Sequence, residues 1–544
     1  MERENRRTSS WFAIAAVVAL GVIAFIGWGR ARVPLPEGAV LVPRDVATLA
    51  EALRTAGEGA TIVLDARRGP YSGPVTLETP GLAIVSTRGR AMLVGSDEPV
   101  VTLRADGTVI RGIDIVGASV GVVVEGTGCV VTDVGVRGGD TALLLSGSQQ
   151  GTFERITVEG GRVGIDASMA SGNVFREIVS RGDAEIGIRL RKARANEIRG
   201  AAIEGAATGL SLEDSEDNLL VEVDIRGASI VGCEVLGGRG NTLTASRIRT
   251  SRAGVVLEGT VENGIADCVV QTVEDVGVSL IDARRNRMER NAVDVCGTDG
   301  VRITGGGENG FVDSRVSRCQ GAGVRADGSD DNLIARNVVS KSPIGIFLAR
   351  SAGARLLGNT VAETNIAGIL LEGARRNELV DNRVDRAPSG IVLIGAEENS
   401  VLRSDLRRCG GIGVVLANRC QANIVTESAV SGAATGVLIT SSSRDAVQAN
   451  RIFACGVGVI IHAPGFGVRV VGNRLERNNV GLRWASTLSP TDAVLAALGI
   501  VPAAEPTGGT PIVQDNFFAG SRWADVENET HELLYAGGNR WDDD

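Results

Sequence analysis

The 544-residue sequence is poor in the side chains on which many enzymes and ligand sites depend. Aromatic residues make up only 3% of the chain, and it contains two histidines, His462 and His531, and four methionines. Glycan clefts usually stack sugars on aromatic rings, so this composition disfavours a deep sugar cleft. The formal net charge of −9 disfavours nucleic acid as a partner.

What the sequence has in abundance is a repeat. The phrase glycine–aliphatic–any–aliphatic returns every 22 or 23 residues from Gly164 to Gly481, and earlier copies begin at Gly121 and Ala142. β-Branched residues alternate with polar ones, and helical spacing is missing, so one repeat suits one turn of a parallel β-helix with three short strands. About sixteen turns at ~4.8 Å each predict a rod of roughly 75–80 Å.

Between Gly164 and Gly390, asparagine lies nine residues after each repeat glycine, and only Ala354 breaks this column. Asparagine tolerates the left-handed backbone of a bend, and its amide can bond to the amide stacked above it. Because buried polar groups must be paired, we interpret the column as a structural ladder and not as a ligand site. Its members are Asn173, Asn196, Asn218, Asn241, Asn263, Asn286, Asn309, Asn332, Asn377 and Asn399. A further column lies five residues on and includes Asn291, Ser314, Asn337, Asn359, Asn382 and Ser404.

These repeats resemble the right-handed parallel β-helix superfamily of pectin-lyase-like proteins, and within it the NosD-like and CASH-type carbohydrate-binding group. The resemblance covers about two thirds of the chain, and it implies an all-β, single-stranded right-handed solenoid with a cap at each end. The closing sequence GNRWDDD is similar to the ending of NosD-like chains, with Arg540 where an aromatic residue is usual. A fold of this kind does not fix a function.

The chain order predicts five parts. Residues 1–10 form a polar tail, and residues 11–28 form an uncharged apolar segment flanked by Trp11 and Trp28, long enough to span a bilayer. A cleaved signal peptide is the alternative to this uncleaved anchor. Residues 33–100 are expected to contain a spacer, a capping helix from Asp45 to Gly57 and the first turns, followed by β-helix repeats over 101–484. Residues 485–544 are expected to hold a loop with a short helix and a C-terminal cap.

In each repeat the residue two positions after the glycine should point outward. This outward column is mostly polar in its first half, and its charged members are Asp166, Arg189, Glu234, Arg302 and Arg325. Pectin-lyase-like enzymes keep their groove on this half, so these five residues are the catalytic candidates if the protein is an enzyme. The motifs of alginate epimerases, polygalacturonases and pectate lyases are missing. The alternative is a solvated charged face, with Asp166 paired to Arg189 across turns.

The second half of the outward column is apolar for six turns: Phe347, Leu370, Val392, Val415, Leu438 and Ile460. A continuous apolar stripe of about 24–29 Å is unusual on an exposed solenoid face. Three alternatives follow: residues around Val494–Ile500 fold back over the stripe, a partner protein covers it, or a second copy of the chain does.

Cysteine and acidic residues suggest two further sites. Cys296 and Cys319 occupy equivalent positions in consecutive turns, so they can form a disulfide if the domain is extracytoplasmic; buried free thiols are the alternative. Acidic bends at 213–218 and 327–332, and Glu308 beside Asp331, suggest calcium weakly, because no known calcium-loop spacing is present. No metal site or cofactor is expected otherwise. The copper assigned to some NosD relatives finds no ligand spacing in this sequence.

Two functions are compatible with these features. The first is a membrane-anchored, non-catalytic extracytoplasmic protein that presents its long face to a polysaccharide or to a membrane-associated protein. The second is a lyase, epimerase or hydrolase that acts on an acidic polysaccharide through the polar half. The missing motifs and the scarcity of histidine and aromatic residues favour the first.

Overall fold

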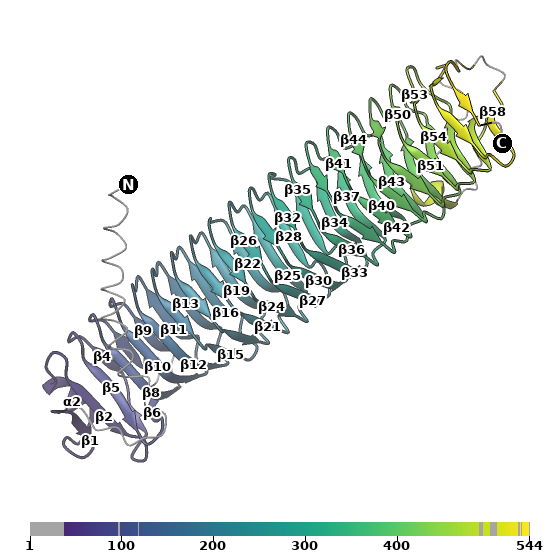
Figure 1. Cartoon of the computed structure of the whole chain (residues 1–544). Coiled ribbons are helices and arrows are strands. Elements are labelled where there is room, and N and C mark those ends of the chain that lie inside the picture. The colour runs from purple at the N-terminus through teal and green to yellow at the C-terminus, as the bar shows by residue number, and fades with distance from the viewer. Residues whose placement is uncertain are drawn as a thin grey trace, which may run out of the picture.

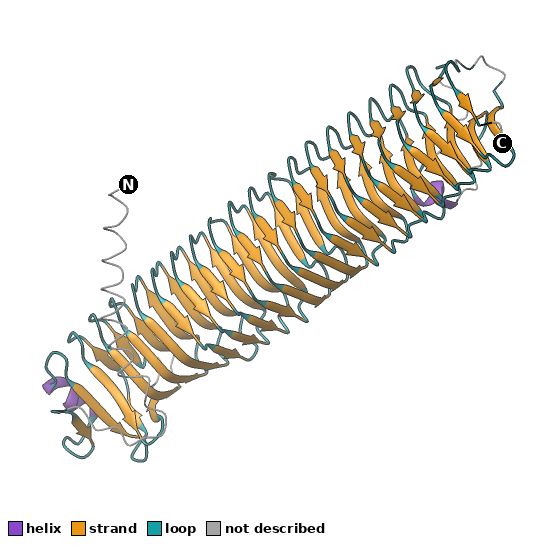
Figure 2. Cartoon of the chain, in the orientation of Figure 1, coloured by secondary structure: helices purple, strands orange, loops and turns teal. Residues whose placement is uncertain are grey.

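The computed structural model of the chain describes residues 37–95, 98–117, 119–488, 493–500, 509–530, 534 and 536–542. Short strands pair in parallel from one turn to the next and stack into an elongated rod, with the N-terminal and C-terminal parts at opposite ends (Figure 1). Almost all of the rod is strand and bend, and the two helices of the described residues lie near its ends (Figure 2). The predicted right-handed parallel β-solenoid is confirmed.

One turn contributes three strands, as the turn at Gly164 illustrates. β13 (Val163–Ser168) lies in one sheet, which we call sheet B, and β14 (Val174–Arg176) and β15 (Val179–Arg181) lie in the other, sheet A. Near the N-terminus the two sheet A strands merge into single strands of eight residues: β8 (Val109–Val116), β10 (Val130–Arg137) and β12 (Thr152–Glu159). The three strands enclose an interior filled by aliphatic side chains from every turn.

Sheet B carries the repeat phrase, one strand per turn. Its strands are β4 (Val75–Leu77), β7 (Val101–Leu103), β9 (Val120–Val124), β11 (Thr141–Ser146), β13, β16 (Ile186–Arg191), β19 (Thr208–Glu213), β22 (Val231–Leu236), β25 (Ala253–Glu258), β28 (Val278–Ile281), β31 (Val301–Thr304), β34 (Ala322–Asp327), β37 (Ile344–Ala349), β40 (Ala367–Glu372), β43 (Ser389–Ile394), β46 (Ile412–Ala417), β49 (Thr435–Thr440), β52 (Val457–His462), β55 (Val480–Ala485) and β58 (Ala524–Asn528). Sheet A holds the remaining strands, from β1 (Val40–Val42) and β2 (Thr61–Asp65) to β57 (Phe517–Ala519) and β59 (Arg540–Trp541).

The repeat glycine is required by close packing between the two sheets. A Cβ atom at Gly345 would lie 2.2 Å from Cγ1 of Val361 and 2.5 Å from the carbonyl oxygen of Gly368. These distances are far below a van der Waals contact, and the other repeat glycines of the regular turns face the same obstacle. Glycine therefore recurs because sheet B begins where the backbone passes directly beneath the sheet A side chains.

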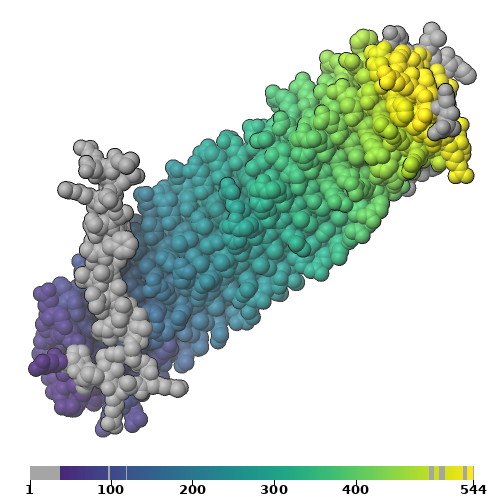
Figure 3. All heavy atoms as spheres, viewed as in Figure 1, coloured from purple at the N-terminus to yellow at the C-terminus, as the bar shows by residue number. Residues whose placement is uncertain are grey.

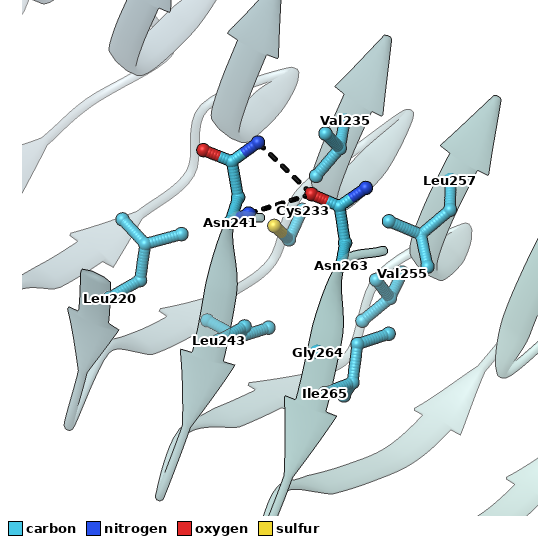
Figure 4. A pocket seen from close by; sticks show the side chains of 10 residues that line it. All are labelled: Leu220, Cys233, Val235, Asn241, Leu243, Val255, Leu257, Asn263, Gly264 and Ile265. Carbon is cyan, nitrogen blue, oxygen red and sulfur yellow. Dashed lines mark hydrogen bonds between the residues drawn. The ribbon is translucent and has the colours of Figure 1, made fainter. Parts of the chain in front are cut away.

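The asparagine column forms a buried ladder along the rod. The backbone N–H and the Nδ2 of Asn241 both donate to Oδ1 of Asn263, at 2.8 and 3.0 Å (Figure 4). Nδ2 of Asn241 also donates to the carbonyl of Ser215 at 2.7 Å. The ten predicted members are at most 3% exposed. Beside this step of the ladder lies an internal cavity of about 10 Å³, roughly the space that one water molecule needs.

The backbone explanation given for the ladder was wrong. The left-handed conformation belongs to the residue before each asparagine, for example Ala195 (φ 52°), Glu262 (φ 59°) and Arg285 (φ 53°). Asparagine is retained instead because its amide can donate to and accept from the neighbouring turns at once, so the buried bend keeps its polar groups paired.

The N-terminal end of the solenoid is capped by α2 (Leu49–Thr55), which is shorter than predicted. Thr48, and not Asp45, is the N-cap: its hydroxyl accepts from the N–H of Glu51 at 3.2 Å. The Asp45 carboxylate instead accepts from the N–H of Leu41 at 3.0 Å. Leu49 and Ala52 are buried against the first turns and close the core at this end.

No helix among the described residues is long and apolar enough to cross a membrane. The predicted anchor at residues 11–28 and the polar tail before it lie outside the described part of the chain. After β55 the chain leaves the solenoid, forms the short α3 (Ala493–Ala497), and returns with β56 (Ile512–Gln514) and β57, which stack on the last regular turn.

Candidate functional site on sheet B

The outward face of sheet B is divided into a polar and an apolar half, as the repeat phrase predicts. In the polar half, Asp166 on β13 is opposite Arg189 on β16. Arg189 donates from Nη2 to Asp166 Oδ2, and the two side chains are only 16% and 6% exposed. Ser168 Oγ donates to the other oxygen of Asp166 at 2.8 Å, and Arg191 Nη2 donates to Ser168 Oγ at 3.1 Å. Both oxygens of the Asp166 carboxylate are therefore engaged within the face.

Arg302 and Arg325 lie opposite each other on the neighbouring strands β31 and β34, and each forms an ion pair with a nearby aspartate. Arg302 Nε donates to Asp299 Oδ2 at 2.7 Å, and the buried Asp299 also accepts from the N–H of Ala322 at 2.7 Å. Arg325 donates to Asp327 at 3.5 Å, and its guanidinium lies 4.9 Å from the ring centroid of Phe347. Arg325 thus sits at the border between the two halves, with a carboxylate in its own half and an aromatic ring in the other.

Glu234 differs from the other four candidates because no cation is paired with it in the described part of the chain. It lies between Ser211 and Val256 in the register of sheet B. Burial raises the pKa of the Glu234 carboxyl, and the nearby Glu213 and Glu258 raise it further, against the effect of the Ser211 hydroxyl. Glu234 is the carboxyl of this face that comes closest to a general acid.

The five candidates do not converge on one centre. Asp166 and Arg189 are one turn apart and in contact, but Glu234 lies two turns from Arg189 and three from Arg302. At ~4.8 Å per turn these steps amount to about 10 and 14 Å, beyond the reach of one reacting group. The structure therefore places two local ion-pair clusters and one isolated carboxyl along the polar half.

The apolar half is covered by the chain's own insertion. Leu495 and Ile500 are buried in one cluster with Phe347, Leu370, Val392, Val415 and Leu438, while Ile460, Leu488 and Leu498 pack around it. Val392 and Val415 are completely buried. We call residues 488 and 493–500 the strap. This arrangement corresponds to the first of the three predicted alternatives, the insertion folding back.

Two partners on this face had not been anticipated. Asp299 holds Arg302, and it could have been recognised as a carboxylate three residues before an arginine at the start of a strand. Ser168, which joins Asp166 to Arg191, follows from the alternation of the strand, because it is two residues after Asp166 on the same face. Leu488 and Leu498 had no signal in the repeat.

The family model described as "Periplasmic copper-binding protein (NosD)" matches residues 83–230, 221–383 and 311–491, which together span most of the chain. The chain belongs to the NosD family. No curated protein is significantly similar to it.

Several solved structures are similar to this NosD-family chain at low sequence identity and low TM-score. The periplasmic alginate epimerase AlgG is 12% identical, with 93% of this chain and 84% of that chain covered and a TM-score of 0.22. The alginate lyase AlyGC of family PL6 is 10% identical over 93% and 100% of the two chains, with a TM-score of 0.32. The A-module of the Azotobacter vinelandii mannuronan C-5 epimerase AlgE4 is 14% identical over 76% and 90%, with a TM-score of 0.24.

The family description implies copper, which proteins bind through thiolate, thioether or imidazole groups. In the part of the chain that the structure describes, no group of three or more His, Cys, Asp or Glu side chains could hold a metal ion. His462 is 3% exposed, and its Nδ1 is within 3.1 Å of Thr440 Oγ1. All eight cysteines are buried in the core. The described residues therefore do not fit a copper site.

Some carboxylates of the acidic bends proposed for calcium form ion pairs with arginines. In the bend at 213–218, Asp217 accepts from Arg194 at 3.4 Å, and in the bend at 327–332, Asp327 accepts from Arg325 at 3.5 Å and from Arg350. Glu308 and Asp331 lie on exposed bends of consecutive turns. Two carboxylates without further ligands are fewer than calcium requires, so calcium binding here stays a prediction.

Proposed function

We propose that this NosD-family chain is a non-catalytic, extracytoplasmic binding protein that presents the polar half of sheet B to a polysaccharide or to a membrane-associated protein. The proposal rests on how the charged candidate residues of the polar half are paired. Four of the five candidate residues are engaged in ion pairs within the face, and the fifth, Glu234, is two to four turns away from each of them.

Pairing of this kind suits recognition better than acid–base chemistry. A general base must be free to accept a proton from a substrate at hydrogen-bond distance. The Asp166 carboxylate already accepts two hydrogen bonds from side chains of the face. The visible side of the rod in Figure 3 is a long continuous surface, and a linear polymer that follows the rod meets the same spacing at every turn.

The membrane anchor is part of the same proposal. Residues 11–28 would hold the solenoid at the outer side of the cytoplasmic membrane, in agreement with the periplasmic description of the family. The anchor would restrict the rod to partners near the membrane surface.

Binding to a panel of neutral and acidic polysaccharides tests the proposal. We expect an acidic polymer to bind, and the double substitution Arg302→Ala and Arg325→Ala to weaken binding at least tenfold. Arg383→Ala, an exposed arginine on sheet A, is the matched control and should leave affinity unchanged. Equal loss in all variants, or no binding by any polymer, would count against the polar half as the binding surface.

An enzyme acting on acidic polysaccharide is the second candidate, and one observation favours it. The raised pKa of Glu234 suits a general acid, with the two carboxylates of Glu213 and Glu258 nearby. In that case product would form, and Glu234→Gln would abolish turnover while it leaves binding intact.

A further inference from the structure

All eight cysteines of the chain are buried free thiols in the structure. In the strand registers of the described residues, only Cys296 and Cys319 lie directly opposite each other. They belong to neighbouring parallel strands, β30 (Ala292–Cys296) and β33 (Arg315–Cys319). Paired strands are about 4.8 Å apart, and disulfides join Cα atoms separated by about 4.4–6.8 Å. The backbone separation is therefore suitable without a change of register.

The two side chains also point the same way. A Cβ atom on Gly277 would lie 3.0 Å from the sulfur of Cys296, and one on Gly300 would lie 2.9 Å from the sulfur of Cys319. Gly277 and Gly300 are the repeat glycines of successive turns, so both sulfurs occupy the same place beneath sheet B. Side chains that point apart cannot be bridged, and this pair does not have that obstacle.

Each cysteine is the last residue of its strand, where the backbone bends. The residues just before them, Val295 and Arg318, both have a φ of 56°. The N–H of Gln320 donates to the carbonyl of Cys296 at 3.0 Å, so the two bends remain attached to each other. A bend can bring two Cβ atoms a few tenths of an ångström closer more easily than the middle of a strand can.

Other cysteines do not meet these conditions. Cys409 and Cys455 share the same column, but Ala433 occupies the turn between them. Two turns correspond to about 9.6 Å, which is beyond the reach of a disulfide. Cys129 faces Thr108, whose hydroxyl is 3.2 Å from its sulfur.

We propose that Cys296 and Cys319 form a disulfide between two successive turns when the chain folds in an oxidising compartment. The family is described as periplasmic. The periplasm is an oxidising compartment in which disulfides form and persist. A disulfide-bearing oxidant supplies the chemistry. One thiolate attacks a sulfur of the oxidant and releases one thiol, and the second cysteine then displaces the other half. The two cysteines lose two electrons and two protons in total, and the oxidant becomes two thiols.

Because the thiols are only 2% and 4% exposed, the bond must form during folding, before the core closes.

Thiol counting in the full chain tests the proposal. The chain is exported to a bacterial periplasm, unfolded in denaturant, and alkylated with N-ethylmaleimide with and without prior reduction. We expect six of the eight thiols to react without reduction and all eight after it, and a peptide that links Cys296 to Cys319 in the unreduced digest. Cys296→Ser should leave all seven remaining thiols reactive, whereas Cys409→Ser should leave five reactive and the bond intact.

Eight reactive thiols in the exported, unreduced chain, or a bond between another pair, would overturn the proposal. If export yields no protein, the reduced full chain can be refolded with a mixture of reduced glutathione and glutathione disulfide. The same count then applies, and the same two results would contradict the bond. Neither result depends on whether the polar half binds a polysaccharide.

Discussion

Asp445 replaces an asparagine at the end of the buried ladder, and this position gives the sharpest prediction. Its Oδ1 accepts from the N–H and the Nδ2 of Asn423, at 2.8 and 3.0 Å, as an asparagine would. Its Oδ2 is buried and has no hydrogen-bond partner. At Asn332, which ends the preceding run of the ladder, Nδ2 occupies the equivalent place and donates to the carbonyl and the hydroxyl of Ser329, at 3.0 and 2.9 Å.

Asp445→Asn should therefore stabilise the protein. Ser442 precedes Asp445 by three residues, as Ser329 precedes Asn332, so the new Nδ2 would find the same kind of acceptors. A buried polar group left unpaired costs about 1–3 kcal/mol, and we expect the substitution to recover about that much at neutral pH.

The gain should depend on pH in a defined direction. Burial raises the pKa of the Asp445 carboxyl, against hydrogen bonds from Asn423. A carboxyl with a raised folded-state pKa contributes stability that is fully present below its unfolded pKa and is lost as pH rises through its folded pKa. The advantage of Asp445→Asn over the parent should therefore be largest above neutral pH and shrink towards pH 4.

Urea denaturation of the parent and the variant at a series of pH values measures this difference. The comparison uses the difference between two proteins, so the many other carboxylates of the chain cancel. Asn332→Asp is the matched control and should show the mirror image: a loss of stability at pH 8 that shrinks as the pH falls. Asp445→Asn that lowers stability at pH 8, or Asn332→Asp that leaves it unchanged, would refute the reasoning.

Three other substitutions test the packing. Gly345→Ala should destabilise the chain by about 1–3 kcal/mol or more, because its Cβ would overlap Val361, and a urea titration would detect this; an unchanged midpoint would contradict the close approach of the two sheets. Asn286→Ala should cost about 2 kcal/mol, because it leaves the N–H and Nδ2 of Asn263 without their acceptor, and faster hydrogen exchange of that turn alone is the expected signature. Leu495→Asp should detach the strap and increase binding of a hydrophobic dye, and unchanged dye binding would argue that the strap does not cover the stripe.

The repeat made most of the fold predictable from sequence. Glycine recurs at a constant interval because the two sheets approach too closely for any side chain at that position. This constraint applies once in every turn. The ladder follows for the same reason, because a buried bend needs an amide that donates and accepts at each turn. The pairing of Asp166 with Arg189 could be anticipated from register, since one turn separates them.

What the sequence left undetermined depends on local geometry. The residue before each ladder asparagine has a left-handed backbone, but it is alanine at 195, glutamate at 262 and arginine at 285. No single residue type therefore identifies this conformation in the sequence. Thr48 caps the helix because its hydroxyl accepts from the N–H of Glu51, and the Glu51 carboxylate accepts from the N–H of Ala47, while Asp45 is used by the preceding bend. The strap comes from a segment without a repeat, and its contacts cannot be derived from the period of the turns.

The most direct test of the proposed function is product analysis on a polysaccharide that the chain binds. The bound polymer is incubated with the chain for an extended period, and its size distribution, unsaturated ends and sugar composition are followed by mass spectrometry. A non-catalytic face predicts that the polymer is unchanged and that Glu234→Gln binds it with the same affinity as the parent. Products that accumulate with the parent and vanish with Glu234→Gln would contradict the account and place a reaction centre on the polar half of sheet B.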